Sequence, residues 1–414
     1  KYSQTVDSFT PRAFYTLQTT DTLTFLKSTI SSKCSYPLIT EDKLFYFDNN
    51  HESIYHVDLK TGENTIIKGS DLFPTYADSD LISYSNLGSD SIIVLANFAK
   101  KDDFHHDSIL AISSLDGNSI RYLDRDFGVL AHSQNNLGLN KQENYLKSDP
   151  FPQLVGNCYK GKVSTSPNDS LVCIPVHKLG AKLGSARFLA DQDTGVRAIC
   201  FDPRQASDFH IIRFEHPMDT ELGVIYPTPY NQFSCHFITN HEIAFSFASS
   251  DSIVIFNLQT QKAYRKYMGS ALADRIALPI KNPKIKRLNK FQMDFSQFYY
   301  LNFEYDPHLN KGYRMYMKPK TNGKGFTRGV LLVGEDLNLK GEAVLPDHLS
   351  NQLIINDEGV YSLHNSANMG DSLIRFEKLS FEKMTNDEQE FRNYVKAKEG
   401  GKMPETQLQL PVSS

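Results

Sequence analysis

The feature that most constrains the fold of this chain is a short phrase that recurs along its length. In each copy an acidic residue is followed by Ser, by Ile or Leu, and then by an apolar stretch. The copies begin at Glu52, Asp90, Asp107, Asp169, Asp251 and Asp371. Asp and Ser hydrogen-bond nearby backbone and so favour turns, whereas apolar and β-branched residues favour strands. Each copy therefore predicts a turn that leads into a strand.

The spacing of the phrase predicts how the strands are grouped. The copies near residues 53, 108, 170, 252 and 372, with Gly312 in the remaining gap, lie about 55 to 82 residues apart, which fits one four-stranded meander per interval. We expect each copy to open the third strand of its meander. One meander cannot bury both of its faces, but meanders stacked around an axis can.

The sequence thus predicts an all-β fold: a six-bladed β-propeller of four-stranded antiparallel blades, with a short C-terminal helix, as one domain over 1–414. The alternative is two separate β-sandwiches, but no linker rich in Pro, Gly and Ser divides the chain. The blades are expected at 43–69, 81–124, 161–202, 241–269, 298–346 and 352–382.

Three further segments lie outside these blades. The stretch 13–26 reads as a two-strand hairpin around Thr20 and Asp21, and one of its strands would complete the last blade and close the ring, because open sheet edges are unfavourable. The stretch 384–400 reads as a helix that starts with a capping box of Thr385 and Glu388. The polar residues 402–414 form a tail.

Composition excludes several classes of protein. The 44 Lys and Arg residues against 48 Asp and Glu residues give a formal net charge of −4, which argues against a nucleic-acid-binding protein. No apolar run reaches the ~18 residues of a membrane-spanning helix. Five cysteines, at positions 34, 158, 173, 200 and 235, contain no closely spaced pair of zinc ligands. We expect buried free thiols, with a Cys158–Cys173 disulfide as the alternative.

No motif in the chain predicts a metal site or a cofactor. The acidic and histidine-rich stretch 102–107 reads as a solvated hairpin loop, and 191–195 reads as a turn that lacks calcium ligands. The stretch 156–163 resembles a phosphate loop but ends in Val163 where a hydroxyl is needed. Five cations within 281–290 read as a solvated connection between blades.

Two regions are rich enough in polar and aromatic residues to bind a ligand. The first is a proline-broken loop over 204–216 and the tyrosines that follow it, and the second is the Tyr305–Arg314 hairpin; loops on a rigid scaffold commonly carry binding residues. The alternative for both is ordinary blade-to-blade hydrogen bonding. The predicted binding residues are Arg204, His210, Arg213, His216, Tyr226, Tyr230, Tyr305 and Arg314.

The second half of the chain contains two hairpin motifs, Tyr305-Asp306-Pro307-His308-Leu309-Asn310 with Gly312-Tyr313-Arg314, and Asn356-Asp357-Glu358-Gly359-Val360-Tyr361. These motifs resemble the TolB-like six-bladed propeller proteins of the Bacteroidetes, a lipoprotein family of unknown function. The resemblance implies an exported protein of the periplasm or outer membrane, anchored through an acylated cysteine upstream of Lys1. It supplies no catalytic residues.

We therefore expect a non-catalytic binding or scaffold propeller at the bacterial cell envelope. It would be a monomer without a cofactor that recognises a protein, peptide or glycan, with no nucleic-acid partner and with membrane contact only through the lipid anchor. The alternative is a propeller hydrolase or lyase with a composite active site at the central channel. That activity would need two carboxylates, or a group of Tyr, His and Arg side chains, that converge there.

Overall fold

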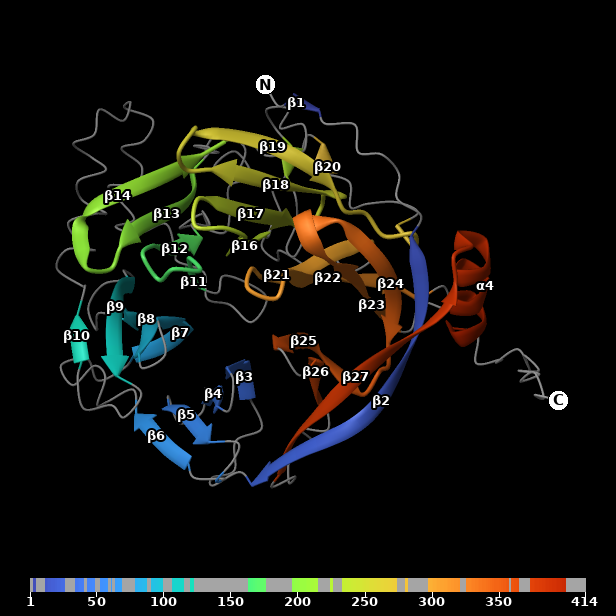
Figure 1. Cartoon of the computed structure of the whole chain (residues 1–414), viewed down its shortest axis with the longest axis horizontal. Coiled ribbons are helices and arrows are strands. Elements are labelled where there is room, and N and C mark those ends of the chain that lie inside the picture. The colour runs from blue at the N-terminus through green and yellow to red at the C-terminus, as the bar shows by residue number, and fades with distance from the viewer. Residues whose placement is uncertain are drawn as a thin grey trace.

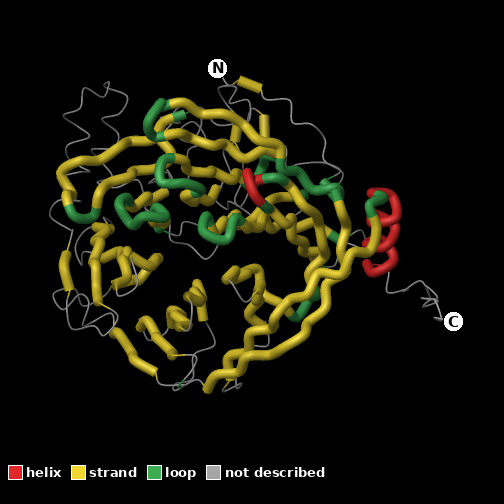
Figure 2. The backbone as a smooth tube through the Cα atoms, in the orientation of Figure 1, coloured by secondary structure: helices red, strands yellow, loops and turns green. Residues whose placement is uncertain are grey.

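The computed structural model describes strands from both halves of the chain and one α-helix. The described residues are 3–4, 12–26, 34–40, 43–48, 53–58, 61, 64–68, 79–87, 91–99, 106–114, 120–122, 163–175, 196–214, 224–225, 233–273, 280–281, 297–320, 325–356, 359–364 and 373–399. The fold is mainly β-structure, as the sequence predicts, and Figure 2 shows that strands make up most of the described backbone.

Four sheets each contain a run of four antiparallel strands that follow one another in the chain. They are β3 (Cys34–Thr40), β4 (Lys43–Asp48), β5 (Ser53–Asp58) and β6 (Asn64–Lys68); β7 (Ser79–Leu87), β8 (Ser91–Ala99), β9 (His106–Ser114) and β10 (Ile120–Tyr122); β11 (Ser164–Thr165), β12 (Val172–Pro175), β13 (Val196–Asp202) and β14 (Gln205–Arg213); and β16 (Phe233–Phe237), β17 (Glu242–Phe247), β18 (Ser252–Asn257) and β19 (Lys262–Tyr267). The short strand β1 (Ser3–Gln4) adds to β19 in parallel, and β15 (Val224–Ile225) pairs with β20 (Ile280–Lys281).

A larger, eight-stranded sheet contains the rest of the strands. It consists of β21 (Tyr299–Asp306), β22 (Lys311–Pro319), β23 (Phe326–Val333), β24 (Leu339–Leu345), β25 (Leu349–Asn356), β26 (Gly359–His364), β27 (Leu373–Thr385) and β2 (Ala13–Leu26). The order is β21-β22-β23-β24-β2-β27-β26-β25. Strand β2, from the N-terminal part of the chain, thus lies between two meanders formed by the C-terminal part.

The sheets follow one another around a common centre (Figure 1). The edge strands β3, β7, β11 and β16 of the smaller sheets lie toward that centre, as do both edge strands of the eight-stranded sheet, β21 and β25. These edge strands contact their neighbours in turn: β7 contacts β11, β11 contacts β16, β16 contacts β21, β21 contacts β25, and β25 contacts β3. Neighbouring meanders are thus in contact at these edge strands, and some strands in the middle of a sheet are buried on both faces. In β18, for example, Ile253, Val254, Ile255 and Phe256 are all buried.

Hydroxyl side chains on the inner edge strands join neighbouring sheets. The Ser164 Oγ of β11 accepts a hydrogen bond from the Phe237 N–H of β16 at 3.0 Å, and the Ser234 Oγ of β16 accepts one from the Phe303 N–H of β21 at 3.2 Å. An edge strand has backbone groups that no strand in its own sheet can pair with, and a buried unpaired N–H is costly. These serines satisfy such groups across the junctions between sheets.

Strand β2 joins the two halves of the eight-stranded sheet. Residues Phe14–Leu26 pair with β27 in antiparallel fashion, and Ala13–Tyr15 pair with Gly341–Ala343 of β24 in parallel. The predicted hairpin at 13–26 is wrong: the segment is one strand with an irregularity between Thr19 and Asp21. The reason is that β27 offers backbone partners along the whole length of β2, so the expected turn is absorbed as a bulge.

A glycine permits the close approach of β2 to β24. A Cβ atom at Gly341 would lie 2.2 Å from the Cε2 atom of Tyr15 and 2.7 Å from the carbonyl oxygen of Ala13. A side chain there would push the two strands apart, because well-packed interiors do not absorb such overlaps. Gly341 is therefore part of the reason that β2 can lie against both meanders.

The C-terminal helix α4 (Glu388–Glu399) packs against the outside of the sheets beside β2 and β27 (Figure 1). The predicted Thr385–Glu388 capping box is wrong. The Asp387 Oδ1 atom caps the helix by accepting a hydrogen bond from the Glu390 N–H at 3.0 Å, while the Thr385 Oγ1 atom accepts one from the Asp387 N–H. Asp387 lies two residues closer than Thr385 to the first turn of the helix, so its carboxylate provides the better cap.

One face of α4 is apolar and buried. Phe391 and Val395 belong to a hydrophobic cluster that includes side chains of β17, β18, β21 and β22. The ring of Phe391 stacks on that of Phe14 from β2, with centroids 4.6 Å apart. The C-terminal helix therefore covers the N-terminal strand. No helix among the described residues is long and apolar enough to span a membrane.

The recurring phrase leads into a strand, but that strand is not always the third of its meander, as predicted from the sequence. The copies at Ser53, Ser108 and Ser252 lie in the third strand of their meanders, and Ser372 lies outside the described residues. The copy at Asp169 precedes β12, which is a second strand, and Gly312 lies in β22, which is also a second strand. For these two copies the predicted strand position is wrong, because the phrase specifies only a local turn and not the neighbour of the strand that follows.

Because Phe391 stacks on Phe14, we predict that truncation of the Phe391 side chain strongly destabilises the protein. We expect F391A to lower the free energy of unfolding by about 3–5 kcal/mol, because it opens a cavity between α4 and β2. The measurement is urea denaturation followed by circular dichroism. The matched control is R392A on the same helix, which removes a partly exposed ion pair with Glu388, and that pair should contribute no more than about 0.5 kcal/mol. Equal effects of the two variants would contradict this role of Phe391.

Candidate functional site

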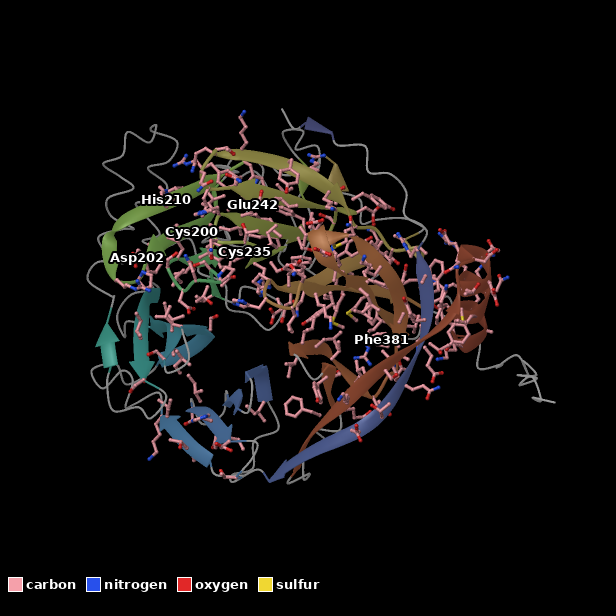
Figure 3. The ribbon with its side chains drawn as sticks, viewed as in Figure 1. Cys200, Asp202, His210, Cys235, Glu242 and Phe381 are labelled. Atoms are coloured by element: carbon pink, nitrogen blue, oxygen red, sulfur yellow. The ribbon has the colours of Figure 1, made fainter. Side chains whose placement is uncertain are left out.

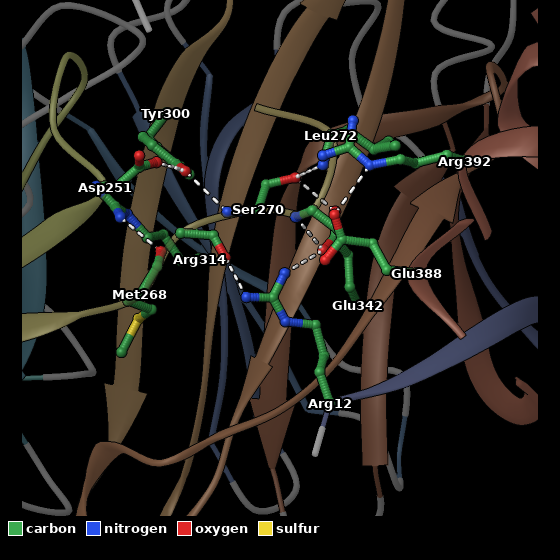
Figure 4. Close-up of polar contacts among 12 residues, drawn as sticks. Arg12, Asp251, Met268, Ser270, Leu272, Tyr300, Arg314, Glu342, Glu388 and Arg392 are labelled. Atoms are coloured by element: carbon green, nitrogen blue, oxygen red, sulfur yellow. Dashed lines mark hydrogen bonds and ion pairs between the residues drawn. The ribbon is translucent and has the colours of Figure 1, made fainter. Parts of the chain in front are cut away.

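A group of charged side chains lies where the β16–β19 sheet meets β21–β24 (Figure 4). Arg314 of β22 is fully buried at its centre. Its guanidinium donates hydrogen bonds to the Ser246 Oγ atom at 2.9 Å and to the carbonyl oxygens of Met268 at 2.8 Å, Phe247 at 3.0 Å and Ser250 at 2.6 Å. These acceptors all belong to the β16–β19 sheet and the residues that follow it. One side chain therefore ties the end of one sheet to the middle of the next.

Tyr300 and Asp251 complete the environment of Arg314. The guanidinium carbon of Arg314 lies 3.6 Å from the centroid of the Tyr300 ring, a cation–π contact. The Tyr300 hydroxyl donates a short hydrogen bond to the Asp251 Oδ1 atom and accepts one from the Ser270 N–H at 2.9 Å. Burial lowers the pKa of Arg314 to about 10 and raises the pKa values of Asp251 and Tyr300.

Glu342 of β24 is the second buried charge of this junction. Its carboxylate accepts hydrogen bonds from the Arg12 Nη1 atom at 2.9 Å, the Ser270 Oγ atom at 2.5 Å and the Ala271 N–H at 2.8 Å. Arg12, which directly precedes β2, also donates to the carbonyl oxygen of Gly269 at 2.6 Å. The residues after β19 are thus held between β24 and the start of β2.

We name these six side chains the junction network: Arg12, Asp251, Ser270, Tyr300, Arg314 and Glu342. Its two buried charges, on Arg314 and Glu342, are directed at partners within the same chain. A buried charge with a full set of hydrogen-bond partners fixes the relative position of the elements that supply them. Any other arrangement would leave the charge without a partner, which is costly. The chemistry that this network supports is positional: it holds two sheets and the N-terminal strand in one arrangement.

Most members of the junction network were not singled out by the sequence analysis. Only Arg314 is among the predicted binding residues. Glu342 carries the clearest signal that could have been used, because it stands in the apolar strand Leu339–Leu345 with buried neighbours on both sides. Arg12 has no such signal, since its partner Glu342 is 330 positions away.

The first predicted binding region is a strand over most of its length. The expected loop at 204–216 is wrong for residues 205–213, which form β14 and pair with β13. The reason is that Ile212 is buried against the β16–β19 sheet, which favours pairing over an open loop. Arg204 lies exposed in the turn before β14, where its N–H donates to the Asp202 Oδ1 atom at 2.8 Å.

The structure places the predicted residues His210 and Arg213 on opposite faces of their sheet. His210 is exposed and lies opposite Cys200, whereas the partly exposed Arg213 lies opposite Val196. Residues three apart on a strand point to opposite faces of the sheet, so His210 and Arg213 face different ways. His210 and Asp202 are labelled in Figure 3. The predicted residues His216, Tyr226 and Tyr230 lie outside the described residues.

The second predicted binding region is a β-hairpin formed by β21 and β22. In its turn the Asp306 Oδ1 atom accepts hydrogen bonds from the N–H groups of His308 and Leu309. Tyr305 is buried, and its hydroxyl donates to the Asn310 Oδ1 atom at 3.4 Å. Arg314 has no exposed surface. The hairpin therefore places both predicted residues inside the protein.

The remaining predictions concern cysteines and metals. Cys173, Cys200 and Cys235 are buried free thiols, so Cys173 does not form the alternative disulfide; Cys158 lies outside the described residues. In the part of the chain that the structure describes, no group of three or more His, Cys, Asp or Glu side chains is placed to hold a metal ion. The stretches 102–105, 156–162, 191–195 and 282–290 lie outside that part.

Comparisons with known proteins relate the fold to propellers. A member of the DUF4221 family from Bacteroides vulgatus, a protein with a propeller-like fold, matches with a TM-score of 0.58 and 15% identity over 90% of this chain and 100% of that one. A PQQ-bound aldose sugar dehydrogenase from Streptomyces coelicolor matches with a TM-score of 0.42 and 10% identity over 87% and 99% of the two chains. A streptogramin B lyase matches with a TM-score of 0.41 and 11% identity over 87% and 97%.

No protein-family model and no curated protein sequence matches the chain. At 15% identity the first of these structural matches shows a shared fold only. The chain therefore has a propeller-like fold.

Replacement of Arg314 tests the junction network. We expect R314K to lower the free energy of unfolding by about 3–5 kcal/mol, because one ammonium group cannot reach acceptors that the guanidinium fork reaches at once, and a buried charge remains. Urea denaturation measures this change. The matched control is K320A, which removes a surface ion pair with Asp347 and should cost at most about 1 kcal/mol. An R314K protein as stable as wild type would show that the network does not hold the junction.

From the raised pKa of Tyr264 in β19 we predict that the protein loses stability at alkaline pH. Burial, and then the negative charge of Glu242, raise the pKa of Tyr264 to about 12. In the unfolded chain this phenol ionises near pH 10, whereas in the folded protein it stays neutral, so the unfolded state is favoured as pH rises from 10 to 12.

The measurement is the free energy of unfolding of wild type and Y264F across this interval. The stability of wild type relative to Y264F should fall as pH rises, and it should be constant below pH 9. A difference between the two proteins that does not depend on pH would contradict the raised pKa.

Proposed function

We propose that this protein is a six-bladed propeller that acts as a non-catalytic binding or scaffold protein at the bacterial cell envelope. Its ligand would be a protein, peptide or glycan. The observation that carries the proposal is the use of the junction network: Arg314 and Glu342, the most deeply buried charges of the described residues, form bonds that join one part of the chain to another. The charged side chains at this junction thus maintain a rigid framework.

The number of blades is inferred from the sheets. Four sheets contribute one meander each. The eight-stranded sheet divides at β2, which leaves β21–β24 as a fifth meander and β25–β27 with β2 as a sixth. Six inner edge strands that contact one another in series support the same number. In this arrangement the last blade is completed by the N-terminal strand, which agrees with the need to avoid an open edge.

Location at the envelope rests on the resemblance to exported TolB-like lipoproteins. We propose an exported monomer in the periplasm or outer membrane, held by a lipid anchor upstream of Lys1. The fold alone cannot assign an activity, because propellers host many functions.

Ligand contact would come from side chains that the framework leaves exposed. Among the predicted binding residues, Arg204 in the turn of the β13–β14 hairpin and His210 in β14 are exposed. Arginine is common among residues that dominate binding energy, whereas buried Arg314 is committed to the framework. We therefore propose Arg204 and His210 as contact residues.

The test combines a binding screen with a turnover assay on the full chain. Immobilised protein is exposed to panels of peptides and bacterial glycans, and the same protein is incubated with glycosides, esters and peptides. We expect saturable binding without turnover, and R204A/H210A should weaken the binding at least about fivefold, as is typical of contact residues. The matched control is K320A, directly after β22.

Turnover of any of these substrates by the purified protein, abolished by D251N or Y300F, would overturn the proposal in favour of a hydrolase or lyase. Binding that R204A/H210A leaves unchanged would keep the function but remove the β13–β14 hairpin from the contact surface.

A further inference from the structure

Three thiols lie together at the junction between the β11–β14 and β16–β19 sheets. Cys173 of β12 lies directly opposite Cys200 of β13 in the pairing of these strands. The Sγ atom of Cys173 lies 4.0 Å from the Sγ atom of Cys235 in β16, which belongs to the neighbouring sheet. All three side chains are buried in one hydrophobic cluster, and Cys200 and Cys235 are labelled in Figure 3.

The two possible partners of Cys173 are not equivalent. Residues directly opposite each other on paired antiparallel strands have Cβ atoms about 4.5–5.5 Å apart, whereas a disulfide brings Cβ atoms to about 3.5–4.5 Å. A Cys173–Cys200 bond would therefore distort the β12–β13 pairing. Cys235 comes from a different sheet, and its Sγ atom lies 4.0 Å from that of Cys173, so a bond between them does not have to be accommodated within a strand pairing.

A bond between Cys173 and Cys235 would stabilise the junction between their two sheets. Nearby, the Ser164 Oγ atom accepts the Phe237 N–H across the same junction. Cys173 and Cys235 are 62 positions apart, so a covalent link would close a long loop of the unfolded chain, and long loops gain most from closure. The link would join two sheets that are otherwise held by side-chain packing and hydrogen bonds.

We propose that Cys173 and Cys235 form a disulfide between these two sheets when the protein folds in the presence of a disulfide oxidant. The Cys173 thiolate attacks a sulfur of the oxidant's disulfide and releases one oxidant thiolate. The Cys235 thiolate then attacks the Cys173 sulfur of this mixed disulfide and releases the second. Two protein thiols are oxidised, one oxidant disulfide is reduced to two thiols, and the two protons pass to the released thiolates.

The burial of the thiols determines when this exchange takes place. Burial raises the pKa values of Cys173 and Cys200, and contact with Cys173 together with burial raises that of Cys235. Thiolates, which carry out the exchange, are thus disfavoured in the folded protein. The bond forms while the sheets assemble, and it is then shielded from reductants because none of the three side chains is exposed by more than 2%.

The test is a refolding experiment on the full wild-type chain. The reduced, denatured protein is refolded in an excess of either oxidised or reduced glutathione, the remaining thiols are alkylated under denaturing conditions, and the peptides are mapped by mass spectrometry without reduction. We expect a linked peptide pair that contains Cys173 and Cys235 after oxidised refolding only. The oxidised protein should have a higher Tm than the reduced one.

Variants separate the proposed pair from its neighbour. C200A should still form the bond and keep the rise in Tm, whereas C235A should lose both. Because the peptide map of wild type needs no variant, the result does not depend on how well the variants fold. Alkylated Cys173 and Cys235 after oxidised refolding, or a Cys173–Cys200 or Cys158–Cys173 peptide pair, would overturn the proposal. The outcome is independent of any ligand-binding result.

Discussion

The pairing of β2 with strands from the far end of the chain is the interaction on which the rest of the structure depends. Antiparallel meanders around a centre bury their faces only if each has a neighbour on both sides. β2 lies against β27 along nearly its whole length and against β24 at its start. It provides the outer strand that the last meander lacks, and Phe391 of α4 covers it from outside. The first and last elements of the chain thus stabilise each other.

Buried charge at one junction gives this packing its specificity. Apolar faces attract each other without strong orientation, because hydrophobic contact is non-directional. Arg314, by contrast, reaches four acceptors in defined directions, and Glu342 does the same for Arg12 and the segment after β19. A shifted arrangement would leave these charges without partners, at a cost of several kcal/mol. The junction network therefore favours one relative position of the sheets.

The sequence predicted those features that are encoded locally. Strand content, tight turns and the presence of a C-terminal helix follow from short-range patterns such as Asp-Ser followed by apolar residues. The position of a strand within its sheet does not, which is why the copies at Asp169 and Gly312 were assigned to the wrong strand. The single strand 13–26 was read as a hairpin because its partner β27 lies more than 340 positions away. The junction network was not predicted for the same reason, since a buried Arg or Glu cannot be identified until its distant partners are known.

Native-state hydrogen exchange tests most directly whether β2 holds the fold together. If it does, the amides of β2 and β27 open only with the whole protein, so their exchange should give the same opening free energy as the β16–β19 sheet and the same as global unfolding. Amides of β2 that exchange through a much smaller opening, while the β16–β19 sheet remains protected, would contradict the account, because the sheets would then stay assembled without their closing strand.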